Sequence, residues 1–292
     1  MTGCKTSYLI KLVQKSLPFR LFLNRALIYI KSKRGDNLEN LITLSYKELP
    51  PKGLLTDFVK CFWWADNPTD ITKEFTILPD GCFGLIFQFH GSQLQTVFLK
   101  GIWTKPFEII IPPNSTFYAI RFKPLAAESI LLFRINEIVD QNMELEEFFW
   151  EINALNFNDL NRFSDLLTAK ILSVYEANGK VDERKKKLFD ILFETKGSLS
   201  VDNISKSLFW SDRQINRYFT HMFGLSLKSY CNILKVYSSY SQIARGDFYP
   251  EQDYYDQAHF IKNVRQYTGT NPKKLYANKK DRFIQLAILD KK

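Results

Sequence analysis

The sequence has few of the residues from which metal sites, disulfides and catalytic centres are built. Only four of its 292 residues are cysteines and three are histidines, and none of them are spaced as a metal-binding pair. Cysteines so scattered indicate a reducing compartment. No HExxH or GxSxG motif and no phosphate-binding glycine loop occurs. We therefore predict no metal, no cofactor and no catalytic residue, which leaves a metal-dependent β-barrel enzyme as the least favoured function.

Long uncharged apolar runs are also missing. Residues 1–40 form an apolar extension, yet the first 35 residues carry eight Lys or Arg and no acid, and these cations interrupt every apolar stretch. A membrane span needs about 20 apolar residues, and a secretory signal needs roughly 7–15 before a cleavage site. We expect a cytoplasmic protein with no membrane partner. The extension itself fits a surface-lying basic helix, a transit-like leader or translation from an over-early start.

Charge divides the rest of the chain unevenly. Residues 36–180 hold twelve basic and nineteen acidic residues, whereas residues 181–292 hold twenty basic and twelve acidic ones. A basic C-terminal third beside an acidic middle suggests that only the C-terminal third faces a polyanion. The alternative is a basic surface that simply meets water.

Residues 41–180 read as a β-rich sensor or regulatory domain that ends in helices. Runs such as KEFTILPDGCFGLIFQFHG and TFYAIRFKP are short, β-branched and aromatic, and turn residues such as Pro79-Asp80-Gly81 separate them. This pattern predicts antiparallel strands in a sandwich or small barrel. Alternation in the last run places Tyr118, Ile120 and Phe122 on one face of its strand.

Helical periodicity follows the strands. Apolar residues at helical spacing between Leu160 and Tyr175 predict an amphipathic helix, used for internal packing or, less often, for a homodimer interface. A charge run over residues 182–187 then marks a linker or a helix start. Because no strand pattern recurs beyond it, the fold class is α+β, with an all-α domain over residues 181–292.

The all-α domain contains an internal repeat of one helical segment. SDRQINRYFTHMFGLSLKSY begins at Ser211, and YYDQAHFIKNVRQYTGTNPKKLY begins at Tyr254. With an offset of 45 residues, Ser211 falls on Asp256 and Gly224 on Gly269. Internal repeats of this kind show how a fold is built. The sequence between the copies, SLKSYCNILKVYSSYSQIAR, predicts one long linker helix.

Each copy has the signals of a helix with one polar face, and in the second copy the spacing places Asn263 on that face. Ser211 with Gln214 three residues later makes a capping box, and Gly224 is the expected left-handed C-cap. A short helix over residues 200–208 precedes the first copy, which is the arrangement of a DNA-reading helix-turn-helix. A plain helical hairpin with a solvated face is the alternative for a single copy.

These two segments resemble the DNA-binding domain of the AraC/XylS family of bacterial transcription regulators. The resemblance covers roughly residues 199–276, and the segment at Tyr254 is similar to the family's signature. Residues 41–125 resemble, more loosely, the sensor domains of some members. The resemblance implies two helix-turn-helix units joined by a linker helix, a transcription factor, for example an activator, that binds double-stranded DNA, and RNA polymerase as a partner. A small-molecule effector and a homodimer fit this implication, but no residue identifies either of them, the operator, or activation as opposed to repression.

The resemblance also implies which residues read bases. In the first copy these are Arg213, Asn216 and Arg217. In the second copy the family's positions include Gln257, His259 and Lys262, whose polar side chains match base edges in the major groove. For His259 the alternative is a neutral ring packed beside Tyr255.

The second copy departs from the family before its reading helix. The stretch GDFYPEQD is about four residues short of a full helix and glycine turn, and Pro250 cannot lie inside a helix. We therefore expect a shortened support for the second copy. An alternative function is a sensor or partner-binding protein that has lost DNA binding.

Overall fold

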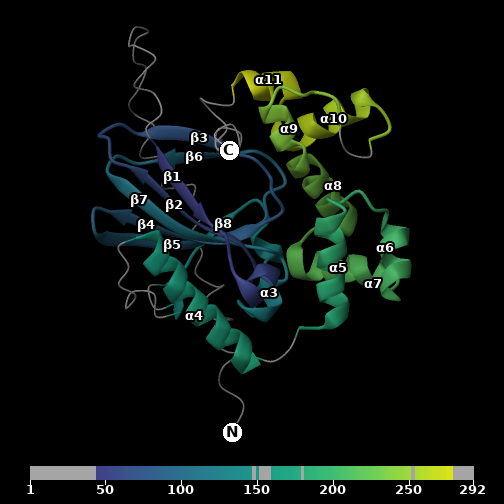
Figure 1. The fold of residues 1–292 in the computed structure, drawn as a ribbon, viewed down its shortest axis with the longest axis horizontal. Coiled ribbons are helices and arrows are strands. Elements are labelled where there is room, and N and C mark those ends of the chain that lie inside the picture. The colour runs from purple at the N-terminus through teal and green to yellow at the C-terminus, as the bar shows by residue number, and fades with distance from the viewer. Residues whose placement is uncertain (1–43, 147–148, 151–158, 179–180, 251–253, 279–292) are drawn as a thin grey trace.

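The protein combines a β-rich part with a helical part that packs against one end of it (Figure 1). The fold is that of a computed structural model, which describes residues 44–146, 149–150, 159–178, 181–250 and 254–278. The extension predicted at residues 1–40 lies outside these ranges. The α+β class predicted from the sequence is confirmed.

The antiparallel strands form two sheets. A six-stranded sheet has the order β1-β2-β7-β4-β5-β8, and β3 pairs with β6 in a separate two-stranded ladder. Turn residues at Pro79, Gly81 and Asn114 separate the strands, and Gly81 takes a positive φ of 72° that favours glycine. The strands are β1 (Ser45–Leu49), β2 (Val59–Asn67), β3 (Lys73–Ile77), β4 (Phe83–His90), β5 (Gln93–Lys100), β6 (Phe107–Ile111), β7 (Ser115–Phe122) and β8 (Asn142–Glu144).

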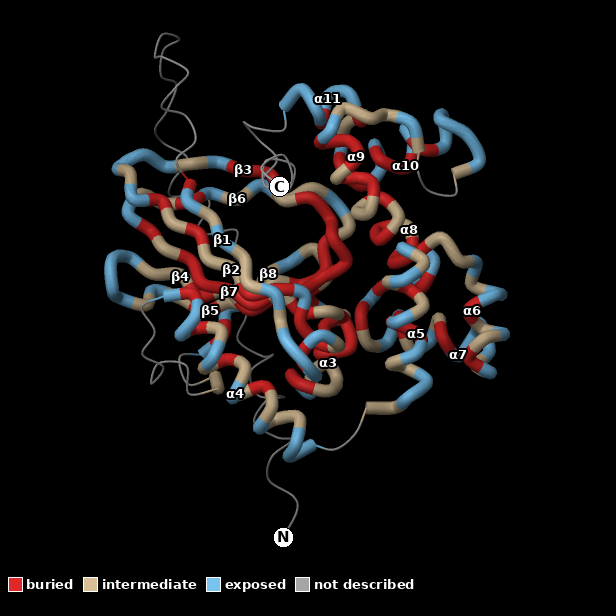
Figure 2. The backbone as a smooth tube through the Cα atoms, viewed as in Figure 1, coloured by how far each residue is buried: buried red, intermediate tan, exposed pale blue. Residues whose placement is uncertain are grey.

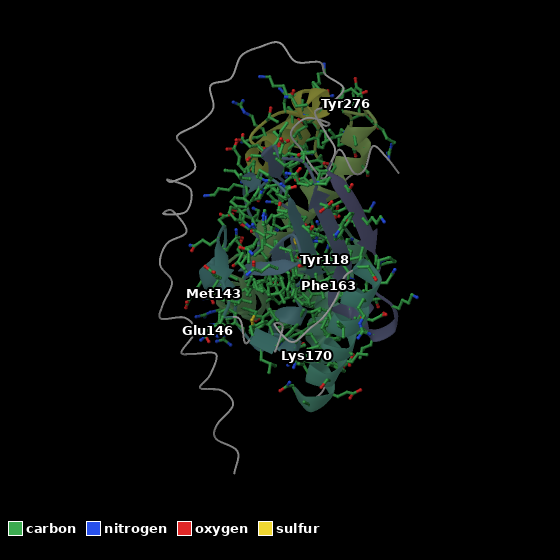
Figure 3. The ribbon with its side chains drawn as sticks, turned by 90° about the vertical axis from the view of Figure 1, so that its left-hand side faces the viewer. Tyr118, Met143, Glu146, Phe163, Lys170 and Tyr276 are labelled. Carbon is green, nitrogen blue, oxygen red and sulfur yellow. The ribbon has the colours of Figure 1, made fainter. Side chains whose placement is uncertain are left out.

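The two faces of the six-stranded sheet have different partners. The predicted alternation in β7 is confirmed, since Tyr118, Ile120 and Phe122 belong to the main core. Helix α4 (Leu160–Asn178) covers this face and inserts Phe163, whose ring lies 5.5 Å from that of Tyr118 (Figure 3). The apolar stripe of α4 thus serves internal packing. Phe117, on the opposite face of β7, joins a smaller cluster with Phe75 and Ile111 of the β3–β6 ladder.

The described residues from 181 to 278 contain helices and no strand. Helix α5 starts inside the predicted charge run, with Asp182 as its N-cap. None of the helices in the described ranges is long and apolar enough to span a membrane. The helices are α5 (Glu183–Glu194), α6 (Val201–Leu208), α7 (Asp212–Phe223), α8 (Leu227–Ser238), α9 (Tyr240–Ala244), α10 (Gln257–Thr268) and α11 (Pro272–Ala277).

The repeat seen in the sequence corresponds to α7 and α10. The capping box of Ser211 and Gln214 is present, and Asp256 accepts a hydrogen bond from the His259 backbone N–H in the same way. Gly224 and Gly269 end the two helices with φ of 70° and 71°. Their matched boundaries follow from the same local signals, a polar N-cap and a left-handed glycine.

Two predictions about this region were wrong. The single linker helix is interrupted at Ser239, whose hydroxyl donates to the Val236 carbonyl at 2.7 Å and competes with regular helix bonding. Asn263, placed by its spacing on the polar face of the second copy, is only 7% exposed. In the stretch predicted to give a shortened support, residues 246–250 form no helix, and residues 251–253 lie outside the described residues.

One core runs through both parts of the molecule. A single cluster of buried apolar residues extends from Leu55 of the β-rich part to Leu275 of α11. The buried segments in Figure 2 run through the central strands and into the inner sides of the helices. The β-rich part and the helices are therefore packed as one body.

Candidate functional site

The first candidate surface is the exposed side of α7, which we call the α7 face (Arg213, Asn216 and Arg217). Ile215, Phe219 and Phe223 point into the core and fix the rotation of the helix. Arg213 and Arg217 are exposed on the other side. Within the described part of the chain neither guanidinium forms an ion pair or a hydrogen bond, so both donor forks are free for an external acceptor.

Asn216 is only half-buried, but its side chain is engaged within the protein. Its Nδ2 donates to the Asp212 carbonyl at 3.0 Å, and its Oδ1 accepts from the Leu227 backbone N–H at 3.2 Å. The second bond satisfies one of the free N–H groups in the first turn of α8. Asn216 therefore ties α7 to α8.

The second candidate surface is the exposed side of α10, the α10 face (Gln257, His259 and Lys262). All three residues are exposed, and Lys262 has no ion-pair partner among the described residues. Gln257 donates a long hydrogen bond of 3.4 Å to the Phe248 carbonyl. The ring packed edge-on against His259 belongs to Tyr254, at 5.6 Å, whereas Tyr255 is 94% exposed.

The two faces belong to one connected assembly. Helix α8 packs against both α7 and α10, and α9 packs against α11. Figure 1 shows α6, α7 and α10 on the side of the molecule away from the sheet. Helices α7 and α10 therefore lie on the same side of the molecule as α8, away from the sheet.

A third candidate site is a cavity of about 650 Å³ between the six-stranded sheet and the β3–β6 ladder. Its size is typical of a small-molecule site. One end meets the helical part, because Tyr237 of α8 belongs to its wall. Most of the wall is apolar, supplied by Trp63, Ala65, Ile77, Ile86, Phe98, Phe107, Ile109, Ile111 and Phe117.

Charged groups gather at one part of this wall. The Arg121 guanidinium lies 3.4 Å from the Asp80 carboxylate and 3.9 Å from Glu48. Lys100 lies on β5, which β4 separates from the Arg121 strand β7, and no hydrogen bond or ion pair to its ammonium occurs within the described ranges. Burial lowers the pKa of Lys100. An ammonium in such a place favours binding a negatively charged group that compensates its lost hydration.

The thiol in the cavity wall does not serve as a nucleophile. Burial raises the pKa of Cys61 to about 11 and that of Cys82, close by in sequence to Asp80, to about 12. Thiols with such pKa values stay protonated and unreactive near neutral pH.

Polar contacts tie the helical part to the β-rich part beside the cavity. Lys185 and Lys186 of α5 pair with Glu128 and Asp57, at 2.8 and 3.2 Å. The Ile135 backbone N–H donates to the Met222 carbonyl, at the end of α7, at 2.9 Å. These contacts hold α5 and α7 against the same body that contains the cavity.

Sequence reasoning missed the cavity residues Lys100, Arg121 and Tyr237. Lys100 and Arg121 occupy strand positions that alternate with core residues, and alternation alone gives neither of them a role. The sequence does contain one signal for these two residues. Each is a cation within an otherwise largely apolar strand, Lys100 in β5 and Arg121 in β7. Tyr237 could not be found in this way, because its position depends on how the two parts pack.

A family model matches the β-rich part of the sequence, and similar solved structures align with a larger share of the chain. Residues 47–144 match a domain of unknown function, DUF6597. A search of curated proteins finds no match to the chain.

The similar solved structures include ToxT from Vibrio cholerae. One crystal structure of ToxT is 11% identical, covers 74% of this chain and 98% of its own, and gives a TM-score of 0.41. Another, of wild-type ToxT with a bound unsaturated fatty acid, is 11% identical, covers 73% and 93%, and gives a TM-score of 0.40. Likeness at this level assigns neither a family nor a site to the present chain.

Proposed function

We propose that the protein is a sequence-specific DNA-binding regulator of transcription. Helices α7 and α10 read two adjacent segments of the major groove, and the β-rich part controls them. The proposal rests on the resemblance of residues 199–276 to AraC/XylS regulators. As such a regulator the protein acts in the bacterial cytoplasm, with double-stranded DNA and RNA polymerase as partners.

The observation that carries the proposal is the matched pair of exposed, basic helix faces. Both helices begin at a polar N-cap, end at a left-handed glycine and bury one apolar stripe. Arg213, Arg217 and Lys262 have no acidic partner within the described residues, so their donors are available to an external acceptor. Phosphates and guanine edges are the acceptors that such side chains bind in DNA.

The six residues have unequal roles in this proposal. Arg213 and Arg217 contact bases or phosphates directly, and Asn216 supports them by holding α7 against α8. On α10, Lys262 and Gln257 make the corresponding contacts, and His259 does so with its ring braced by Tyr254.

DNA binding by single variants tests the proposal. We expect the protein to bind DNA from upstream of its own gene tightly and in a salt-sensitive way. Arg217→Ala and Lys262→Ala should each weaken binding by about 1–3 kcal/mol. Lys206→Ala is the matched control, because Lys206 is exposed on α6 and already paired with Asp202 at 2.6 Å. Fluorescence anisotropy measures all four proteins.

The outcomes are distinct. Wild-type protein that binds this DNA no better than random DNA at low salt rules the proposal out. An effect of Arg217→Ala without any effect of Lys262→Ala limits sequence reading to α7. The alternative function, a sensor that no longer binds DNA, predicts no effect of either variant.

We further propose that the cavity is the effector site. Its apolar wall suits a hydrocarbon or aromatic body, and Lys100 with Arg121 suits an acidic group on that body. The effector class is thus a small amphipathic acid. Oleate serves as a probe of this class, with displacement of anilinonaphthalene sulfonate fluorescence as the measurement.

A further inference from the structure

The turn Pro79-Asp80-Gly81 joins the wall of the cavity to the helices that carry the α7 and α10 faces. We infer that this turn transmits occupancy of the cavity to the two reading helices. The inference rests on the proposed function and adds to it the element through which an effector acts. Three observations support it.

First, the turn is hydrogen-bonded to the helical part through its backbone. The Tyr230 hydroxyl donates to the Gly81 carbonyl, and the Tyr240 hydroxyl donates to the Pro79 carbonyl, each at 3.0 Å. Both tyrosines are fully buried. Burial raises the pKa of each well above its ordinary value, so both hydroxyls keep the proton that they donate.

Second, the side chain of the same turn lies in the cavity wall. Asp80 is 3% exposed, pairs with Arg121 and accepts a hydrogen bond from the Cys82 backbone N–H at 3.0 Å. An acidic ligand at Lys100 and Arg121 competes with Asp80 for the guanidinium. Loss or rotation of that ion pair changes the position of the turn, because the Asp80 carboxylate is also bonded to the backbone that follows it.

Third, the turn fits tightly against α8. A Cβ added at Gly81 would lie 3.0 Å from the Leu234 side chain and 3.2 Å from the Tyr230 hydroxyl oxygen. Closely packed interfaces move between discrete arrangements and do not deform smoothly. A shift of the turn is therefore passed on to α8.

The two tyrosines lie on either side of the break in the linker. Tyr230 belongs to α8, and Tyr240 is the first residue of α9, so the turn bonds both segments across Ser239. Helix α8 packs against both α7 and α10, and α9 packs against α11. A shift of the turn therefore reaches the α7 face through α8, and it reaches the α10 segment through α8 and through α9 with α11.

The test removes the two hydroxyls without removing the rings. Tyr230→Phe/Tyr240→Phe is compared with wild type and with Tyr249→Phe, a control whose side chain is 71% exposed. DNA affinity is measured with and without oleate, and oleate affinity is measured separately. Tyr240→Phe alone serves as a milder variant if the double variant does not fold.

We expect oleate to change the DNA affinity of wild type and Tyr249→Phe by about fivefold or more, in either direction. In the double variant, oleate should leave the DNA affinity unchanged, a factor of about one. Its affinity for oleate, and its affinity for DNA without oleate, should each stay within about threefold of wild type. The inference is overturned if oleate changes the DNA affinity by the same factor in wild type and in the double variant. An absence of any effect of oleate on wild type that binds both oleate and DNA also overturns it.

Hydrogen exchange separates this inference from the proposed function. If wild type binds no DNA, the proposed function fails, and the transmission is then read from the backbone amides of α8 and α9. Oleate should slow or speed their exchange in wild type and leave it unchanged in the double variant. Unchanged exchange in wild type, or a failure of oleate to bind, contradicts the inference.

Discussion

Lys100 is a cation that the fold places in an apolar cavity without a partner among the described residues. Such a residue costs stability in the free protein, so its presence fits a ligand that compensates the charge. We expect Lys100→Met to raise the free energy of unfolding by about 1 kcal/mol and to abolish oleate binding. Lys47→Met, at an exposed position outside the cavity, should do neither. Thermal unfolding and fluorescence displacement measure the two effects.

The pH dependence of stability has a definite sign at this residue. Because burial lowers the pKa of Lys100, the unfolded chain holds the proton at a pH where the folded protein has released it. Between the folded pKa and the ordinary value of 10.5, stability contributed by Lys100 therefore rises with pH. Lys100→Met should remove this contribution, and an unchanged pH profile would contradict the assignment of Lys100 as a buried, unpaired cation.

Substitution of Asn216 should lower the stability of the fold, whereas substitution of its neighbour Arg217 should not. Asn216→Ala deletes two hydrogen bonds within the protein and leaves the Leu227 N–H without its partner, so we expect a loss of roughly 1–2 kcal/mol in stability. Arg217→Ala should leave the unfolding temperature nearly unchanged. Were Asn216→Ala to weaken DNA binding with no loss of stability, Asn216 would be a base-reading residue.

At the scale of elements, the two C-cap glycines form a natural pair. Both take φ near 70°, so alanine at either position costs about 1 kcal/mol of backbone strain. A Cβ at Gly224 would also lie 2.7 Å from the Asn136 carbonyl oxygen of the β-rich part, whereas at Gly269 the nearest atom, in Pro106, is 3.6 Å away. We expect Gly224→Ala to cost about 2 kcal/mol more than Gly269→Ala in thermal unfolding. Equal costs would show that α7 does not dock on the segment at Asn136.

The elements that the sequence predicts best are those set by local chemistry. Ser211 with Gln214, Asp256, Gly224 and Gly269 mark helix ends through bonds within a few residues, and all are found as predicted. The alternation of β7 was also readable, because one face of a sheet packs a core.

What the sequence could not predict depends on contacts between distant segments. The cavity needs two ladders from strands far apart in the chain, and the bonds of Tyr230 and Tyr240 to the turn span 149 and 161 residues. The interruption at Ser239 has a local cause, but a serine in an apolar helical pattern is compatible with either outcome. The burial of Asn263 likewise reflects the packing of α10, which periodicity alone assigned to the wrong side.

At the scale of the whole molecule, the core that continues into the helices reaches the cavity wall at Phe83 and Ile120, whereas much of the rest of the apolar wall belongs to the smaller cluster of the β3–β6 ladder. In the proposed regulator, a shift of the turn in the cavity wall acts directly on α8, because the turn is hydrogen-bonded to Tyr230 of that helix.

The most direct test of the central claim is a hydroxyl-radical footprint on DNA from upstream of the gene. Two reading helices on one body should protect two segments on one side of the duplex, with centres about 10–10.5 base pairs, or roughly 34 Å, apart. Arg217→Ala should weaken one segment and Lys262→Ala the other. A single protected segment that Lys262→Ala leaves unchanged, or no protection beyond that on random DNA, would contradict the account.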